Sequence, residues 1–133
     1  MAVEEKAPLV LVIEDSPSML ELTVKTLQIS GFRTRQASYA LQAVGVARKE
    51  RPDLILADVG LPDMDGATAT ALLRDDPDFQ DVPVILVSAL PPEELRERMA
   101  DCGAAEILPK PFTPGDLVRA VRRQLSQHAD TPL

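Results

Sequence analysis

The sequence predicts an α/β fold in which helices cover both faces of one parallel sheet. Short apolar runs alternate along the chain with longer segments whose apolar residues have helical spacing, and this alternation is typical of parallel sheets. The apolar runs are continuous, as in strands that are buried on both faces. With 133 residues, 45% of them hydrophobic, the chain can bury one core but not the cores of two ordinary domains.

The first strand and the first helix have clear signals. Leu9 to Ile13 is apolar and rich in β-branched residues, which predicts a buried strand. Ser16 and Pro17 then give a helix start, in which the Ser16 side chain can cap and Pro17 suits the first turn. The helix is expected to stop at Gly31, and the short polar segment 33–37 alternates as a second strand does.

The remainder of the chain repeats this unit of strand and helix. We expect a helix over residues 39–50, a strand over 54–58, a helix over 65–76, a strand over 82–88, a helix from 91 to a stop at Gly103, a strand over 105–109 and a helix over 113–127.

Five strands joined by right-handed crossovers most commonly adopt the flavodoxin-like order 2-1-3-4-5, a doubly wound parallel (βα)5 sheet. This order puts the polar strand 33–37 at one edge. It puts Pro109, which cannot donate a ladder hydrogen bond, in the strand at the other edge. We therefore expect one domain over residues 9–127, with an N-terminal tail at 1–8 and a C-terminal tail at 128–133.

Charge and composition exclude several classes of function. A formal net charge of −7 opposes binding to nucleic acid or anionic lipid, because both attract basic surfaces. No apolar stretch approaches the ~20 residues that cross a bilayer, so we expect no membrane insertion and a cytoplasmic location. The single cysteine, Cys102, cannot form an internal disulfide and is expected to be packed and inert.

Chemically active side chains follow four of the five predicted strands at the edge where their carboxyl ends meet. They are Glu14 and Asp15 after the first strand, Asp58 at the end of the third, Ser88 at the end of the fourth and Lys110 after the fifth. Such edges form the functional crevice of doubly wound sheets. Two carboxylates ~5 Å apart repel each other by about 3 kcal/mol at an effective dielectric constant of ~20. We therefore expect a hard divalent cation, Mg²⁺, among the acids.

Together these groups suit the acceptance of a phosphoryl group. Asp58 would be the nucleophile, Lys110 would offset negative charge, and the Ser88 hydroxyl would donate to an arriving oxygen. Taken singly, an acid at a strand end most often caps the next helix, a lysine is most often a solvated charge, and a serine is most often a turn residue. The interpretation depends on their combination at one edge.

This combination resembles the receiver domain of two-component response regulators over nearly the whole chain. The residues that carry the resemblance are Glu14 and Asp15, Asp58 with the following "LPDMDG", Ser88, and "KPF" at Lys110 to Phe112. The resemblance implies a phosphorylation switch rather than an enzyme. Asp58 would accept phosphate from a phosphohistidine on a sensor histidine kinase or a histidine phosphotransfer protein.

The resemblance also implies the roles of the other site residues. Mg²⁺ would be held by Glu14, Asp15, Asp58 and the backbone carbonyl of Gly60. Ser88 and Lys110 would bind the phosphoryl oxygens, and the bond between Lys110 and Pro111 would be cis. The output face would comprise Glu93 to Arg98, the fifth strand and the arginines 119, 122 and 123. It would act on a partner protein or an effector domain, with no direct contact to nucleic acid.

The chain departs from the family at two places. The family usually has an aromatic switch residue three positions before the lysine, where this chain has Ile107, so Ser88 and Ile107 are the expected switch positions. Gly60 and Leu90 offer no polar side chain to position an attacking water. We therefore expect a long-lived phosphoryl state.

Other functions remain possible at this point. "DMDGA" at Asp63 to Ala67 resembles the signature of haloacid dehalogenase phosphatases, although Asp63 lies five residues after the strand end at Asp58. A flavin or nucleotide binder lacks its glycine-rich phosphate loop. A third possibility is a docking module that is not phosphorylated.

Overall fold

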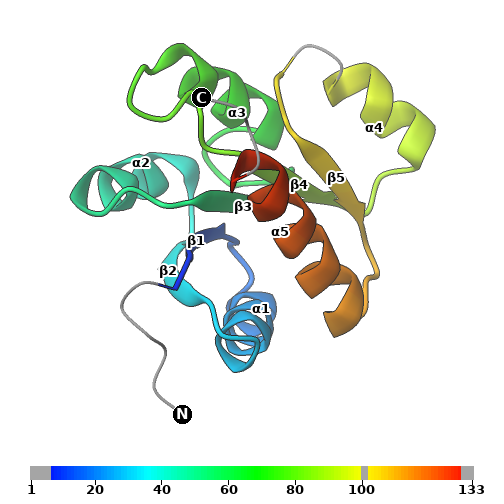
Figure 1. The fold of residues 1–133 in the computed structure, drawn as a ribbon. Coiled ribbons are helices and arrows are strands. Elements are labelled where there is room, and N and C mark those ends of the chain that lie inside the picture. The colour runs from blue at the N-terminus through cyan, green and yellow to red at the C-terminus, as the bar shows by residue number, and fades with distance from the viewer. Residues whose placement is uncertain (1–6, 100–101, 130–133) are drawn as a thin grey trace.

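The computed structural model describes residues 7–99 and 102–129, and it contains one five-stranded parallel sheet in the order β2-β1-β3-β4-β5 (Figure 1). The strands are β1 (Leu9–Ile13), β2 (Arg33–Ala37), β3 (Leu54–Asp58), β4 (Val84–Ser88) and β5 (Glu106–Pro109). The helices are α1 (Pro17–Ile29), α2 (Ala40–Lys49), α3 (Gly66–Asp75), α4 (Pro92–Met99) and α5 (Pro114–Ala129). The predicted fold class and strand order are confirmed.

Most element bounds agree with the predictions to within two residues. The exception is α4, which was expected to continue to a stop at Gly103 and is described only to Met99, before residues 100 and 101, which lie outside the described part of the chain. β4 begins at Val84 because Val82 is still held in a turn by the Phe79 carbonyl, and Pro83 has no N–H. α5 continues to Ala129, so residues 128 and 129 belong to this helix and not to the expected tail at 128–133. Residues 1–6 and 130–133 of the two expected tails lie outside the described part of the chain.

The capping role expected of Ser16 is wrong. Ser16 occupies the N-cap position of α1, but its side chain makes no capping hydrogen bond. Its hydroxyl lies 3.3 Å from the Ser18 hydroxyl instead, and its backbone N–H donates to Glu14 Oε2 at 3.3 Å. Through this contact the Ser16 backbone orients the carboxylate of Glu14, which directly follows β1.

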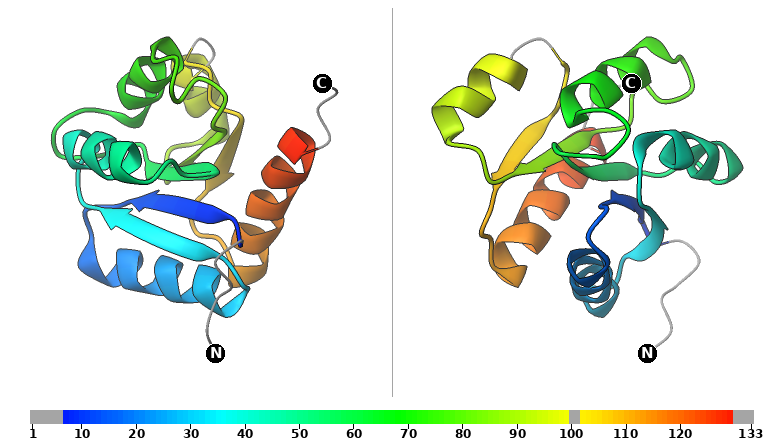
Figure 2. Two further views of the ribbon diagram at one scale, coloured as in Figure 1. Left: turned by 60° about the vertical axis from the view of Figure 1, so that its left-hand side comes forward. Right: turned by 180° about the vertical axis from the view of Figure 1, so that it is seen from behind.

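Helices cover both faces of the sheet (Figure 2), and the sheet separates two apolar layers of side chains. Val10 and Val12 of β1 face α1 and α5, where they pack with Leu27 and Leu117. Alternate residues of the same strand, such as Leu11, belong to the other layer beneath α2 and α3. Since β1 is fully buried on both faces, its continuous apolar sequence is explained.

The strand order reverses between β1 and β3. The chain leaves β1 toward β2 on one side, and it leaves β3 toward β4 on the other. The two connections diverge at the carboxyl ends of these neighbouring strands, which is where doubly wound sheets have their functional crevice. The acids predicted from the sequence follow these two strands.

Candidate functional site

Three carboxylates meet at the carboxyl ends of β1 and β3. Glu14, Asp15 and Asp58 each place one carboxylate oxygen within 4.8 Å of the others. Glu14 is buried, Asp58 is half-buried and Asp15 is exposed, so the cluster opens to solvent on one side. The structure therefore brings together the three acids that the sequence predicted to converge.

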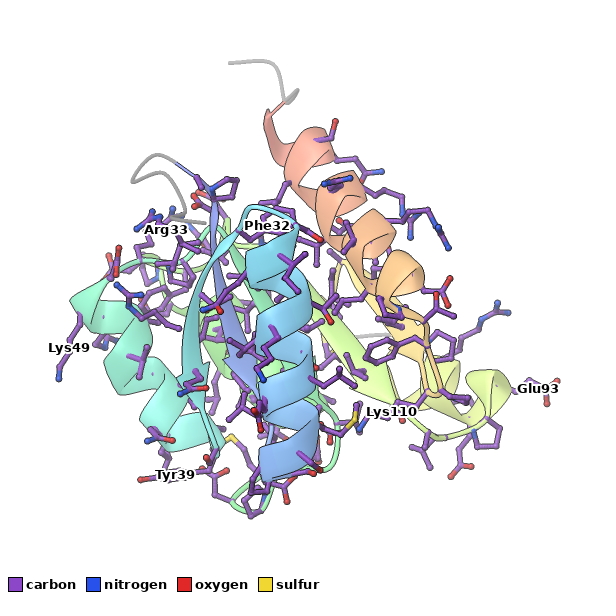
Figure 3. The ribbon with its side chains drawn as sticks, turned by 90° about the horizontal axis from the view of Figure 1, so that it is seen from below. Phe32, Arg33, Tyr39, Lys49, Glu93 and Lys110 are labelled. Carbon is purple, nitrogen blue, oxygen red and sulfur yellow. The ribbon has the colours of Figure 1, made fainter. Side chains whose placement is uncertain are left out.

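Lys110 reaches this cluster from the end of β5. Its Nζ lies 3.2 Å from Asp58 Oδ2 and 3.4 Å from Glu14 Oε1. Its backbone N–H donates to the Ser88 carbonyl at 2.8 Å, and the peptide bond to Pro111 is cis. Figure 3 shows Lys110 at this end of the sheet, far from Lys49 at the end of α2. The lysine thus joins the ends of β1, β3 and β4.

The charges of the cluster displace two pKa values. Burial, together with repulsion from Asp58, raises the pKa of Glu14, although the Ser16 N–H and Lys110 oppose the shift. Burial alone would lower the pKa of Lys110, but attraction to Asp58 and Glu14 outweighs it and raises that pKa. The ammonium is therefore held charged, and it offsets only part of the negative charge around it.

Ser88 lies at the end of β4 and is buried. Its hydroxyl oxygen accepts the Leu90 backbone N–H at 3.0 Å. The hydroxyl proton is not needed for that contact, so it remains available as a donor to an oxygen at the edge of the sheet. Ile107 is half-buried and packs against the same apolar layer as Leu90.

The segment after Asp58 orients the carboxylate. The Gly60 N–H donates to Asp58 Oδ1 at 3.1 Å, while Lys110 contacts the other oxygen. Asp65 caps α3 by accepting the Thr68 N–H at 2.9 Å, as the sequence suggests. Gly66 is sterically required, because an added Cβ would lie 2.9 Å from both the Val59 Cα and Leu86 Cδ2.

The donor set fits a hard divalent cation. Three carboxylates can contribute one oxygen each to a single ion, and the Lys110 ammonium leaves part of their charge uncompensated. The Gly60 peptide lies beside Asp58 and is exposed. Glu14, Asp15 and Asp58 thus have the ligand atoms and the charge that suit such an ion.

Asp63, the nucleophile of the alternative phosphatase interpretation, is engaged elsewhere. Its Oδ1 accepts the Ala40 N–H at 2.8 Å and its Oδ2 accepts the Leu41 N–H at 2.9 Å. Both oxygens therefore cap α2, a role that sequence reasoning missed. A signal was present in the sequence, because Tyr39 at the start of α2 is a poor capping residue.

The arginines of α5 are partly neutralised within the chain. Arg119 pairs with Asp116 at 2.6 Å, and Arg123 forms a two-bond ion pair with Glu106 of β5. Such pairing is typical of a solvated helix face rather than of a surface for nucleic acid.

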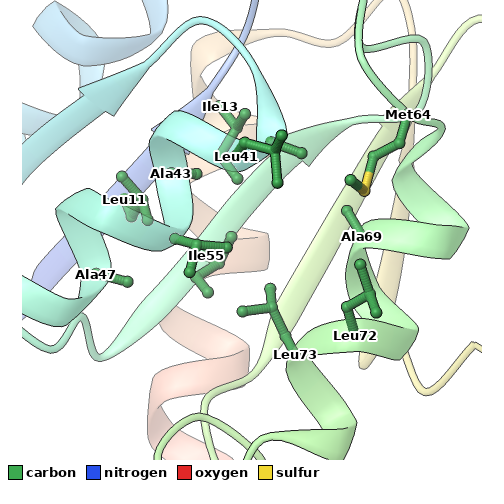
Figure 4. Close-up of a pocket in the computed structure, with 12 residues that line it drawn as sticks. Leu11, Ile13, Leu41, Ala43, Ala47, Ile55, Met64, Ala69, Leu72 and Leu73 are labelled. Carbon is green, nitrogen blue, oxygen red and sulfur yellow. The ribbon is translucent and has the colours of Figure 1, made fainter.

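A small apolar cavity of about 30 Å³ lies between α2 and α3 over the sheet (Figure 4). Its lining includes Leu41, Met64 and Leu72, with no charged side chain. Leu41 and Leu72 are exposed, so the hollow lies at the surface between the two helices; its lining has no catalytic group and does not include the carboxylate cluster. The described residues that carry chemistry thus lie at the carboxyl edge of the sheet.

A scan against protein families identifies the chain. Residues 10–122 match the response regulator receiver domain, and this span contains the three acids, Ser88 and Lys110. The chain belongs to the receiver domain family. Receiver domains are signalling switches of two-component systems, and they interact with histidine kinases and downstream effectors.

Individual relatives agree with this assignment. The polar-differentiation response regulator DivK of Brucella anthropi is 31% identical over 116 residues, which cover 87% of this chain and 94% of that protein. The signal receiver domain of a histidine kinase from Syntrophus aciditrophicus is 34% identical, with a TM-score of 0.87 over 95% of this chain and 96% of that one.

A third receiver bears on the metal. The receiver domain of the sensor histidine kinase PA1611 from Pseudomonas aeruginosa PAO1 is 31% identical, with a TM-score of 0.83 over 90% of this chain and 98% of that chain. That structure has a magnesium ion coordinated in its active site cleft. Mg²⁺ binding is a property of the receiver family, and the acid cluster of this chain has the composition for it.

Among the described residues, no helix is both long enough and apolar enough to cross a membrane.

Proposed function

We propose that Asp58 accepts a phosphoryl group from a phosphohistidine of a sensor histidine kinase or a histidine phosphotransfer protein, in a reaction that requires Mg²⁺. The observation that carries this proposal is the placement of the Asp58 carboxylate at a rigid strand end, among two further acids and one ammonium. A strand buried on both sides aims this carboxylate at one place, which favours in-line attack.

In the proposed reaction, one carboxylate oxygen of Asp58 forms a bond to phosphorus. The bond from phosphorus to the donor's imidazole nitrogen breaks, and the nitrogen keeps the electron pair. The Gly60 N–H and Lys110 hold the two Asp58 oxygens before attack. Mg²⁺ would be held by Glu14, Asp15, Asp58 and the Gly60 carbonyl. Its positive charge would offset the negative charge of the carboxylates and of the incoming phosphoryl group.

Phosphorylation would rearrange the contacts of Lys110 and Ser88. Lys110 would exchange part of its pairing with Asp58 and Glu14 for the phosphoryl oxygens. The Ser88 hydroxyl would donate to a phosphoryl oxygen and move toward it. Because the same hydroxyl oxygen accepts the Leu90 N–H, this movement would displace Leu90 as well. Leu90 and Ile107 pack against one apolar layer, so this movement would reach the face formed by α4, β5 and α5. A partner protein or effector domain would recognise that face.

The test is intact mass after incubation with acetyl phosphate, with and without Mg²⁺. We expect one phosphoryl group on the wild type with Mg²⁺, and none without the metal or on Asp58→Asn. Asp76→Asn, at the distant end of α3, is the matched control and should behave as wild type. A wild type that binds Mg²⁺ but gains no mass would contradict the proposal and leave the docking module as the function to test.

A further inference from the structure

Asp63 makes contacts that bridge two distant parts of the chain. Its two carboxylate oxygens accept the N–H groups of Ala40 and Leu41, which open α2 and lie 23 and 22 residues earlier in the sequence. Tyr39, the N-cap residue of α2, provides no capping side chain. Asp63 therefore ties its own loop to the start of α2.

Residues 59–65 form the loop that carries Asp63, and we call it the acceptor loop because it follows Asp58 directly. Its base is closed by an antiparallel bridge between Gly60 and Asp65 and by the Gly66 N–H, which donates to the Val59 carbonyl at 2.7 Å. Beyond this base, Leu61 is buried in the apolar layer and Asp63 contacts α2. The loop is thus fixed both at its base and at its tip.

The Gly60 peptide depends on these ties. Gly60 is exposed, and the side of its Cα on which a Cβ would lie is open within 4 Å. Yet its N–H orients Asp58 Oδ1 at 3.1 Å, and its carbonyl belongs to the proposed Mg²⁺ ligands. Its position depends on the buried neighbours Val59 and Leu61, on the bridge to Asp65 and on the anchoring of the loop tip by Asp63.

We propose that Asp63 is a positioning residue for phosphoryl transfer, which acts by fixing the acceptor loop so that the Gly60 peptide can orient Asp58 and complete the Mg²⁺ site. This inference rests on the proposed function. A carboxylate suits the role, because it accepts two backbone N–H groups and carries a negative charge at the positive end of the α2 dipole. Partial desolvation opposes that charge, but the N–H groups of Leu41 and Ala40 outweigh it and lower the pKa of Asp63.

The experiment compares Asp63→Ala and Asp63→Asn with the wild type and with a matched control, Asp76→Ala. Asp76 also accepts two contacts, from Arg48 at 2.6 Å and from the Asp78 N–H at 2.9 Å, but it lies at the end of α3 away from the acids. Mg²⁺ affinity is measured by calorimetry. Hydrogen exchange of residues 59–66 is measured without Mg²⁺, and phosphorylation by acetyl phosphate is followed at saturating Mg²⁺.

We expect Asp63→Ala to weaken Mg²⁺ binding about tenfold, the lower end of the effect of losing a supporting contact at a metal site. Exchange in the acceptor loop should become faster, and phosphorylation slower. Asp63→Asn should show a smaller effect, because its amide oxygen keeps one acceptor. Asp76→Ala should lose stability yet keep its Mg²⁺ affinity and the exchange rates of the loop.

The inference is overturned if the Mg²⁺ affinity of Asp63→Ala stays within about twofold of the wild type and hydrogen exchange of its acceptor loop is unchanged. Removal of a supporting contact at a metal site should weaken metal binding by more than that. If Asp63→Ala does not fold, Asp63→Asn takes its place, and exchange in the acceptor loop equal to that of the wild type overturns the inference. A wild type that neither binds Mg²⁺ nor accepts phosphate overturns the proposed function itself, and the role of Asp63 with it. A wild type that does both, beside unaffected Asp63 variants, overturns only the role of Asp63.

Discussion

Glu14 and Lys110 have pKa values displaced in the same direction for different reasons. Burial and the neighbouring Asp58 disfavour the charge of Glu14, whereas the two carboxylates favour the charge of Lys110 against its burial. The ammonium is the partner of Asp58, and in the proposed reaction it would exchange part of this contact for one with a phosphoryl oxygen. The resting contacts of these residues therefore match the charges of the proposed reaction.

The exposed backbone at Gly60 leads to a prediction about the lifetime of the phosphoryl group. Neither Gly60 nor the apolar Leu90 side chain can direct a water at phosphorus, so hydrolysis of phosphorylated Asp58 should be slow. Gly60→Asn adds an amide where space is open, and it should speed hydrolysis several-fold by positioning water, which is less than the roughly 10²-fold that a positioned general base contributes. Loss of the phosphoryl mass with time measures the rate.

Gly60→Ala is the control for this substitution, because it adds a Cβ without a polar group. Its hydrolysis rate should equal that of the wild type. Equal acceleration by alanine and asparagine would mean that the backbone, and not a positioned water, sets the lifetime.

At the scale of the helices, two glycines have opposite environments. In α2 an added Cβ at Gly45 meets nothing within 4 Å, whereas at Gly66 of α3 it meets the Val59 backbone at 2.9 Å. Gly45→Ala should raise the free energy of unfolding by about 0.5–1 kcal/mol, through helix propensity. Gly66→Ala should lower it by about 1–3 kcal/mol, through overpacking. Urea unfolding of both variants measures the difference, and equal shifts would contradict the assigned contacts.

The contact between β5 and α5 should depend on pH. Hydrogen bonds from Arg123 and Gln124 to Glu106 outweigh burial and lower the pKa of this carboxyl below its ordinary 4.5. A lowered folded-state pKa contributes stability that is present above the unfolded value and is lost as the pH falls through the folded one. Unfolding free energy should therefore decline below about pH 4.5, and Glu106→Gln should make that decline shallower. Urea unfolding from pH 6 downward tests this, and parallel profiles would contradict it.

At the scale of the molecule, the acid cluster should couple metal binding to stability. A ligand that binds only the folded state stabilises it by about 1.4 kcal/mol at ten times its Kd, so Tm should rise with Mg²⁺ concentration. Asp58→Asn should reduce the rise, because it removes one of the clustered carboxylates. Calorimetric scans at constant ionic strength measure the effect, and NaCl alone should not reproduce it. An equal rise in wild type and variant would place the ion elsewhere.

Much of the fold and of the site was predictable because local signals and global topology agree. The apolar run at Leu9–Ile13 and the acids after it define both a buried strand and its reactive end. Other features were not predictable. Ser16 has the sequence of a capping residue, yet its hydroxyl lies beside Ser18, while Asp63 caps a helix from which it is distant in sequence. Local propensity cannot determine which of several nearby acceptors a backbone N–H finds after folding.

The sequence alone determined the strand order, the set of acids, the lysine and the serine, because hydrophobic periodicity and strand ends are local properties that parallel topology brings to one edge. Only the tertiary structure decided how these groups pair. The Lys110 ammonium contacts both Asp58 and Glu14, and the Gly60 N–H donates to one Asp58 oxygen. Asp63 joins the acceptor loop to the start of α2. These contacts join residues up to 96 positions apart, and their distances depend on the packing of the whole sheet.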